Sequence, residues 1–125
     1  MILLLDAHAL LWWLADDHGL APAARRAIAD PGSDVLVSAA TVWEIGIKRS
    51  LGKLQAPDDV LGAIETAGFD YLPVTLADGH AAAGLPNHHR DPFDRMLVAQ
   101  AMRLGAVLVS RDPAFAPYGV DVLPT

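Results

Sequence analysis

The stretch Ile2-Leu3-Leu4-Leu5-Asp6 is a short apolar run that ends in a carboxylate, and this pattern predicts a buried β-strand. The segment Ala7–Ala15 that follows is rich in Ala, Leu and Trp and predicts a helix. Short strands are also expected at Val35–Val37 and Ala106–Val109, with helical sequence between them. Because strands and helices alternate, we predict an α/β fold with a mostly parallel central sheet, whose functional residues gather at the carboxyl ends of the strands.

Turn and capping residues set the bounds of the other expected elements. Ser38 is a good N-cap for the helix that follows it, and prolines are expected to open three other helices. The remaining predicted helices are Ala23–Ala29 after Pro22, Ala39–Ser50, Asp58–Ala67 after Pro57, Thr75–Gly84, and a long one from Asp91-Pro92 to Leu104. Phe69–Val74 is predicted to be extended at the sheet edge because Pro73 cannot donate to a ladder, and Val120–Leu123 is predicted to be a final short strand.

Length and composition limit the classes of protein that fit. The chain has 125 residues, with 9 Lys and Arg against 15 Asp and Glu, a net charge of −6, and 53% hydrophobic residues. We therefore expect residues 1–125 to form a single domain, and the composition excludes disorder. The lack of cysteine excludes disulfides, thiolate zinc sites and a cysteine nucleophile. The acidic balance argues against wrapping duplex DNA on a basic face.

The start of the chain indicates where the protein works. No window of about 18 uncharged apolar residues exists, so no membrane span is expected. The first apolar run has no basic segment before it and stops at Asp6, which argues against a signal peptide. With no cysteine, these features fit a cytoplasmic protein.

Four carboxylates stand where a site would be expected. Asp6 directly follows the first strand, and Asp112 follows the strand that ends at Val109. Asp94 lies in the first turn of a helix, and Glu44 lies on a partly apolar helix face. Taken singly, each has an ordinary structural role: Asp6 and Asp112 suit N-caps or turns, Asp94 suits a helix start, and Glu44 suits a solvated helix surface.

Taken together, these carboxylates point to a metal site. Like charges at about 4 Å repel by several kcal/mol at an effective dielectric near 20, so an empty cluster must hold protons or a cation. Oxygen ligands without thiolates select a hard ion such as Mg²⁺ or Mn²⁺. Such an ion can lower the pKa of a bound water and contact a phosphate oxygen, which is the chemistry of phosphodiester hydrolysis.

The stretches that carry the four carboxylates resemble the PIN-domain ribonucleases, most closely the VapC-type toxins of bacterial type II toxin–antitoxin modules. The likeness runs in the family's order and spacing over nearly the whole chain. The matching stretches are Leu3–Asp6, Ser38–Ile45, Asp91–Ala101 and Leu108–Phe115.

The resemblance implies a fold, an activity and partners. The fold would be a PIN-like three-layer α/β/α sandwich, and the family's acidic tetrad, both catalytic and metal-binding, falls on Asp6, Glu44, Asp94 and Asp112. The activity would be a Mg²⁺- or Mn²⁺-dependent endoribonuclease that hydrolyses RNA phosphodiester bonds. The partners would be RNA, a second copy of the chain in a homodimer, and a cognate VapB-type antitoxin.

Two other classes of protein are alternatives to a PIN-domain ribonuclease. A PIN-like fold that has become a non-catalytic RNA- or protein-binding module is the main alternative, although all four acidic positions are filled here. A receiver domain or a small phosphohydrolase fits poorly. The late strand is followed by Ser110-Arg111-Asp112 instead of the lysine of a receiver, and Asp6-Ala7-His8-Ala9 lacks the second aspartate of a haloacid-dehalogenase-type phosphatase.

Residues beside the tetrad are candidates for supporting roles. Asp91 is interpreted as the N-cap that orients Asp94, and the alternative is that it binds the metal or contacts the metal ligands. Ser110 stands where the family often has a hydroxyl beside its last aspartate. Four cations flank the motifs and either grip RNA phosphates or form ordinary surface pairs, namely Lys48, Arg90, Arg95 and Arg111.

Histidine and tryptophan are expected to have structural roles. His88 and His89 are interpreted as parts of a solvated loop, with RNA contact or proton transfer as the alternative. His8 is interpreted as a packed or capped helix residue. Zinc is not expected, because no second histidine follows at the spacing of a zinc helix. Trp43 is expected in the core, and one of the adjacent Trp12 and Trp13 is expected to be half-exposed.

Overall fold

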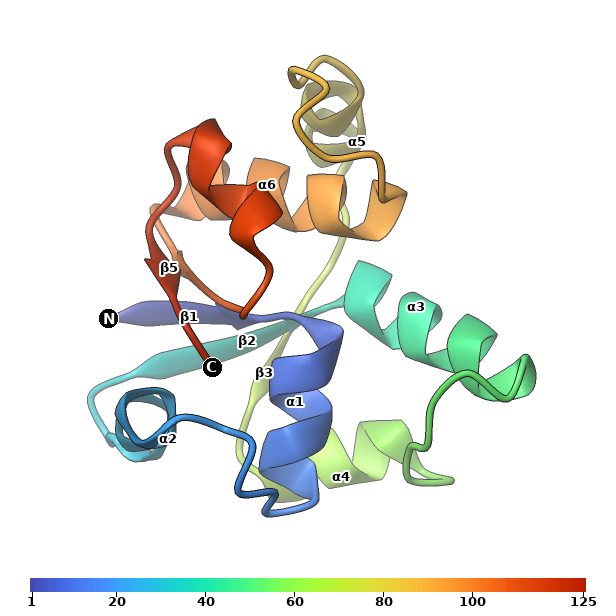
Figure 1. Ribbon diagram of the computed structural model, residues 1–125, viewed down its shortest axis with the longest axis vertical. Helices are drawn as coiled ribbons and strands as arrows, with labels where there is room; N and C mark the ends of the chain where they lie inside the picture. The colour runs from blue at the N-terminus through green and yellow to red at the C-terminus, as the bar shows by residue number, and fades with distance from the viewer.

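A five-stranded, all-parallel sheet forms the centre of the molecule (Figure 1). The computed structural model describes residues 1–125. The strand order is β3-β2-β1-β4-β5, which confirms the predicted α/β class and sharpens "mostly parallel" to entirely parallel. The strands are β1 (Ile2–Leu5), β2 (Asp34–Ser38), β3 (Asp70–Leu72), β4 (Val107–Val109) and β5 (Val122–Leu123).

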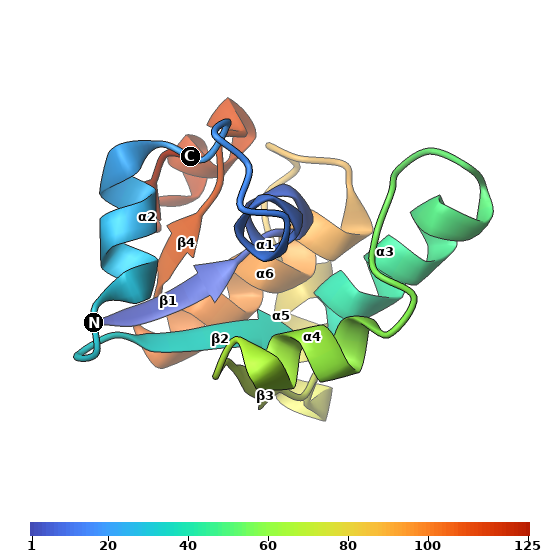
Figure 2. The ribbon, with the colours of Figure 1, turned by 90° about the horizontal axis from the view of Figure 1, so that it is seen from below.

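Helices cover both faces of the sheet and complete three layers. Figures 1 and 2 show α5 and α6 on one face and α1, α2 and α4 on the other, while α3 continues outward from the end of β2. The helices are α1 (Ala7–Leu14), α2 (Pro22–Ala29), α3 (Ala39–Ser50), α4 (Val60–Thr66), α5 (Leu76–Ala83), α6 (Pro92–Leu104) and the 3₁₀-helix η1 (Pro113–Tyr118).

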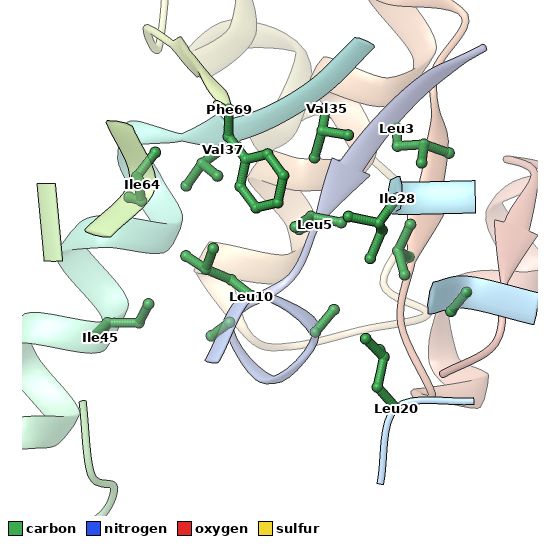
Figure 3. Packing of buried hydrophobic residues seen from close by; sticks show 14 residues of the cluster. Leu3, Leu5, Leu10, Leu20, Ile28, Val35, Val37, Ile45, Ile64 and Phe69 are labelled. Atoms are coloured by element: carbon green, nitrogen blue, oxygen red, sulfur yellow. The ribbon is translucent and has the colours of Figure 1, made fainter. Parts of the chain in front are cut away.

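The apolar run of β1 contributes side chains to two hydrophobic cores, because successive side chains of a strand point to opposite faces of the sheet. Leu3 and Leu5 join the larger cluster, which packs against α1 and α2 (Figure 3). Leu4 joins the smaller cluster, where it packs with residues of α6 and η1. All three leucines are fully buried, which explains why this strand reads as a continuous apolar run.

The central strands deliver their carboxyl ends to one edge. β1 and β4 pair in parallel with Leu5 opposite Val109, and the Asp6 N–H donates to the Val109 carbonyl at 3.2 Å. The residues that follow each strand therefore leave the sheet side by side. This register places Asp6 beside the Ser110–Asp112 turn, as the sequence predicts for a parallel sheet.

Two local features differ from the predictions. α4 begins after Asp59, not after Pro57, because the Asp59 carboxylate caps the helix by accepting the Gly62 N–H. Residues 113–118 form the 3₁₀-helix η1, which is not among the predicted elements, with Asp112 as its N-cap. No helix has the length and apolar character needed to cross a membrane.

Candidate metal centre

A cleft of about 600 Å³ opens at the carboxyl edge of the sheet. It contains all four carboxylates that the sequence singled out, together with Asp91. Asp6 and Asp112 are the N-caps of α1 and η1, whereas Glu44 lies in α3 and Asp94 in α6. Five carboxylates in this cleft face only two Lys or Arg side chains, Lys48 and Arg111. The walls therefore carry an excess of negative charge, which favours a cation. The lining residues are Asp6, Ala7, His8, Trp12, Glu44, Lys48, His89, Asp91, Asp94, Arg111, Asp112 and Pro113.

Asp6 is both a helix cap and a wall of the cleft. Its Oδ1 accepts the Ala9 N–H at 2.8 Å, which fixes the carboxylate at the start of α1. The residue is only 8% exposed. Burial raises the pKa of Asp6 above its usual value, and a hydrogen bond from Ser110 opposes that rise. The capping role and the site role are therefore combined in one side chain.

Asp94 shows the strongest electrostatic perturbation in the cleft. Asp91 caps α6 by accepting the N–H groups of Phe93 and Asp94, as predicted, and so fixes the turn that carries Asp94. Burial, followed by the negative charges of Asp91 and Glu44, raises the pKa of Asp94 to about 7. A carboxyl group at this pKa holds a proton near neutral pH unless a cation neutralises its surroundings.

Glu44 enters the cleft from α3. The residue is 4% exposed, so it is not the solvated helix residue of the alternative interpretation. The Lys48 ammonium, one helical turn further along, donates to its Oε2. The contact with Glu44 raises the pKa of Lys48 and keeps this lysine charged.

Asp112 lies where the chain leaves β4. Its Oδ1 accepts the Ala114 N–H at 2.9 Å, and its own N–H donates to Ser110 Oγ at 3.0 Å. Ser110 is 1% exposed and lies against both Asp6 and Asp112. Its hydroxyl therefore links the Asp6 carboxylate to the backbone of Asp112.

His89 is the functional residue that the sequence interpretation missed. Its Nε2 lies 2.9 Å from the Oδ2 atoms of both Asp94 and Asp112, so the prediction of a solvated loop residue was wrong. His88, in contrast, is exposed as expected. No local signal separates the two histidines, although their position directly before the motif Asp91–Asp94 marks the loop as a neighbour of the site.

Two other aromatic predictions also need correction. His8 packs on α1 with its ring edge-on to the Trp12 ring, but it is exposed and lines the cleft. Trp43 is 67% exposed and was wrongly placed in the core. Successive residues of a helix point about 100° apart, so the turn that aims Glu44 into the cleft directs Trp43 outward, against the edge of Phe93. Trp12 and Trp13 are both half-buried.

Of the four basic side chains that are candidates for RNA binding, two line the cleft and two do not. Lys48 and Arg111 line the cleft, and the Arg111 guanidinium lies 3.9 Å from the centroid of the Trp12 ring. Arg95 instead donates to the carbonyls of Ala82, Leu85, Pro86 and His89, so its guanidinium anchors the α5–α6 loop. Arg90 is exposed and lies outside the cleft lining.

The donor set fits a hard divalent cation. One ligand atom each of His89, Asp94 and Asp112 lies within 4.8 Å of the others, and the oxygens of Asp6 and Glu44 line the same cleft. Carboxylate oxygens are the ligands that Mg²⁺ and Mn²⁺ prefer. Burial and the neighbouring carboxylates raise the pKa of Asp94, and a cation bound beside it would lower that pKa.

Comparisons with known proteins agree with this architecture. The PIN-domain family model matches residues 3–120. The ribonuclease VapC22 of Mycobacterium tuberculosis is 30% identical over 112 residues, which cover 87% of this chain and 85% of that protein. Two crystal structures of DNA-bound VapBC share the fold: VapBC2 from Rickettsia felis, with a TM-score of 0.73 and 10% identity, and VapBC from Salmonella typhimurium, with a TM-score of 0.69 and 17% identity. Each likeness covers 99% of this chain and 98% of the matched one.

Proposed function

The chain belongs to the PIN-domain family, among its VapC-type members, and from this premise we propose that it is a Mg²⁺- or Mn²⁺-dependent endoribonuclease, the toxin of a VapBC-type module. The observation that carries the proposal is the cleft, in which five carboxylates face only the side chains of Lys48 and Arg111 and the pKa of Asp94 is raised to about 7. We also infer that residues 1–125 form one PIN domain that acts in the cytoplasm, where its RNA substrate is found.

Asp6, Glu44, Asp94 and Asp112 would hold the metal. Their oxygens come from four separate elements and meet in one cleft, and none is provided with a neutralising arginine. When bound, Mg²⁺ or Mn²⁺ would supply Lewis-acid stabilisation of a phosphate oxygen and would ease the ionisation of a water for attack on phosphorus. Either ion also explains how an acidic protein holds an anionic substrate.

The chain's own residues would orient the RNA. Arg111 presents a guanidinium at the cleft that has no carboxylate partner, because its neighbours are the Trp12 ring and the Gly19 carbonyl at 3.2 Å. This leaves it able to bind a phosphate oxygen. Lys48 lies at the same cleft but is already paired with Glu44, so its main effect is to position that carboxylate.

Two protein partners follow from the same proposal. A VapB-type antitoxin is supported by the VapBC complexes that share this fold. A homodimer is supported by an apolar surface pocket of about 470 Å³ between α3 and the start of α6, which includes the exposed Trp43. The pocket is lined by Ala39, Ala40, Trp43, Val74, Pro92, Phe93 and Met96.

RNA cleavage by the purified, antitoxin-free chain tests the activity. We expect cleavage in Mg²⁺ or Mn²⁺, none in excess EDTA, and a loss of at least about 100-fold in Asp6→Asn and Asp94→Asn. Asp58→Asn is the matched control, because Asp58 is an exposed carboxylate paired with Arg49 outside the cleft. Full activity in EDTA or in Asp6→Asn would contradict the mechanism. Calorimetry without any Mg²⁺ or Mn²⁺ binding would favour the non-catalytic RNA- or protein-binding module instead.

A further inference from the structure

Both ring nitrogens of His89 have specific partners. Nδ1 accepts the backbone N–H of Asp91 at 3.2 Å. Nε2 lies 2.9 Å from Oδ2 of Asp94 and 2.9 Å from Oδ2 of Asp112. The side chain is 15% exposed. A ring with partners on both sides cannot turn over without losing them.

The backbone and the ring face of His89 are fixed as well. The His89 N–H donates to Tyr118 Oη at 2.9 Å, and the His89 carbonyl accepts from Arg95 Nη1 at 3.3 Å. The ring lies 5.7 Å from the Phe115 ring, centroid to centroid. The loop between α5 and α6 is therefore built to hold this imidazole in place, with contacts to both α6 and η1.

The Asp91 N–H determines which nitrogen carries the ring proton. A backbone N–H is only a donor, so Nδ1 must accept and the ring proton must lie on Nε2. The Nε2–H then donates to Oδ2 of Asp112, which stands at the start of η1. Oδ2 of Asp94, on α6, lies 2.9 Å from the same nitrogen, so His89 contacts carboxylates from two different elements.

We propose that His89 is a positioning residue of the metal centre, whose Nε2–H donates to Asp112 in contact with Asp94 and sets the spacing of their oxygens for the cation. This inference rests on the proposed function. The Asp112 oxygen keeps a further lone pair for a metal after it accepts this hydrogen bond. Donors of this kind orient ligating carboxylates and raise metal affinity.

The same geometry argues against His89 as a direct metal ligand. Nε2 would have to lose its proton to bind an ion, and the ring proton would then lie on Nδ1, directed at the Asp91 N–H. Two donors would face each other, and the hydrogen bond that fixes the loop would be lost. Coordination through oxygen, with His89 as a donor behind the ligands, keeps every contact.

Measurements of Mn²⁺ affinity test the positioning role of His89. We expect His89→Ala to bind Mn²⁺ at least about tenfold more weakly than wild type in calorimetry, and His89→Gln, whose amide can still donate, to recover part of that loss. His88→Ala is the matched control, because His88 is the exposed neighbour that lies against Tyr118 and touches no carboxylate. Its Mn²⁺ affinity should equal that of wild type. RNA cleavage by His89→Ala should recover when Mn²⁺ is raised.

Two spectroscopic measurements complete the test and use the wild-type chain. ¹⁵N NMR of the metal-free protein should show the His89 proton on Nε2. Pulsed EPR of the Mn²⁺-loaded protein should show no directly bonded ¹⁴N. A proton on Nδ1, or a bonded ¹⁴N, would overturn the positioning role.

The outcomes also distinguish this inference from the proposed function. Wild type that binds no Mn²⁺ would overturn both. Wild type that binds Mn²⁺ and cleaves RNA, with His89→Ala binding Mn²⁺ equally well, would overturn the role of His89 alone.

Discussion

The carboxyl group of Asp94 is enclosed beside Asp91 and Glu44, and its pKa is raised to about 7. In the unfolded chain it returns to an ordinary aspartate value near 3.8. Between these two values only the folded state holds the proton, so the free energy of unfolding of the metal-free protein should decrease as pH rises from about 4 to 7. The charge that a metal would neutralise thus destabilises the empty fold.

Replacing Asp94 should therefore stabilise the metal-free protein at the expense of metal binding. In EDTA at pH 8 we expect the free energy of unfolding of Asp94→Asn, measured by urea denaturation, to exceed that of wild type by on the order of 2 kcal/mol. This difference should shrink towards pH 4. Saturating Mg²⁺ should stabilise wild type but not the variant. A variant that is less stable than wild type at pH 8 in EDTA would show that the carboxylate cluster is not repulsive.

Arg111 carries a second prediction at the scale of one side chain. Its guanidinium lies on the Trp12 ring at the mouth of the cleft, without a carboxylate partner. We expect Arg111→Leu to raise the KM for a short single-stranded RNA by about tenfold with a smaller change in kcat, because a charged contact to phosphate is lost. The slope of log KM against log salt should fall by about one unit.

The control for this variant is Arg26→Leu. Arg26 is an exposed arginine on α2 that lies outside the cleft lining. Its loss removes the same formal charge from the molecule. An equal effect of both substitutions on KM would mean that the net charge matters and that Arg111 has no specific contact.

Among the helices, α5 and α6 are joined by an ion pair between a buried aspartate and an exposed arginine. The Arg103 guanidinium donates to both carboxylate oxygens of Asp78, at 2.7 and 3.0 Å. Asp78 is also part of the capping box of α5 with Thr75 and is 1% exposed. The contact with Arg103 is the main cause that lowers the pKa of Asp78 to about 2.

This ion pair predicts how stability depends on acid. The folded pKa is depressed, so the pair stabilises the fold above pH 4, and that contribution is lost as pH falls towards 2. Because Arg103 is exposed and solvent screens the pair, we expect a contribution on the order of 1 kcal/mol, measured by urea denaturation between pH 2 and 6. This contribution should be absent in Arg103→Met. Arg49→Met should change the pH profile little, since its partner Asp58 is exposed. Identical pH profiles for wild type and Arg103→Met would contradict this assignment.

Element boundaries could be predicted where local chemistry decides them. The N-cap of α3 at Ser38 and the Asp91-Pro92 start of α6 agree with the structure, because caps act through hydrogen bonds within one turn. The start of α4 was misplaced because Pro57 and Asp59 both signal a helix start, and only the folded chain shows which one caps. η1 was missed because its prolines suggest a turn.

Residue environments are less predictable because they depend on distant parts of the chain. The position of Asp6 and Asp112 at one sheet edge follows from strand ends in a parallel sheet. The environment of His89 does not, since its partners Asp112 and Tyr118 come from η1, more than twenty residues later. The outward direction of Trp43 likewise depends on how α3 is rotated against α6.

At the scale of the whole molecule, the charged cleft and the apolar pocket use the same two helices. The cleft contains Glu44 and Asp94, whereas the pocket contains their neighbours Trp43 and Phe93. Apolar side chains that line one surface pocket, with Trp43 67% exposed, favour a protein contact. Glu44 and Trp43 are adjacent on α3, so a contact at this surface would also fix the helix that carries a proposed metal ligand.

The proposed homodimer should therefore depend on this pocket. We expect the wild-type chain to sediment as a dimer and Trp43→Lys to sediment as a monomer, because the substitution places a charge in the apolar contact. Leu51→Lys is the control, since Leu51 is an exposed leucine just after the end of α3 that lies outside the pocket. A Trp43→Lys protein that remains a dimer would show that the dimer interface lies on another surface. A monomer whose Mn²⁺ affinity also falls would show that pairing of two copies stabilises α3 and, through it, the position of Glu44.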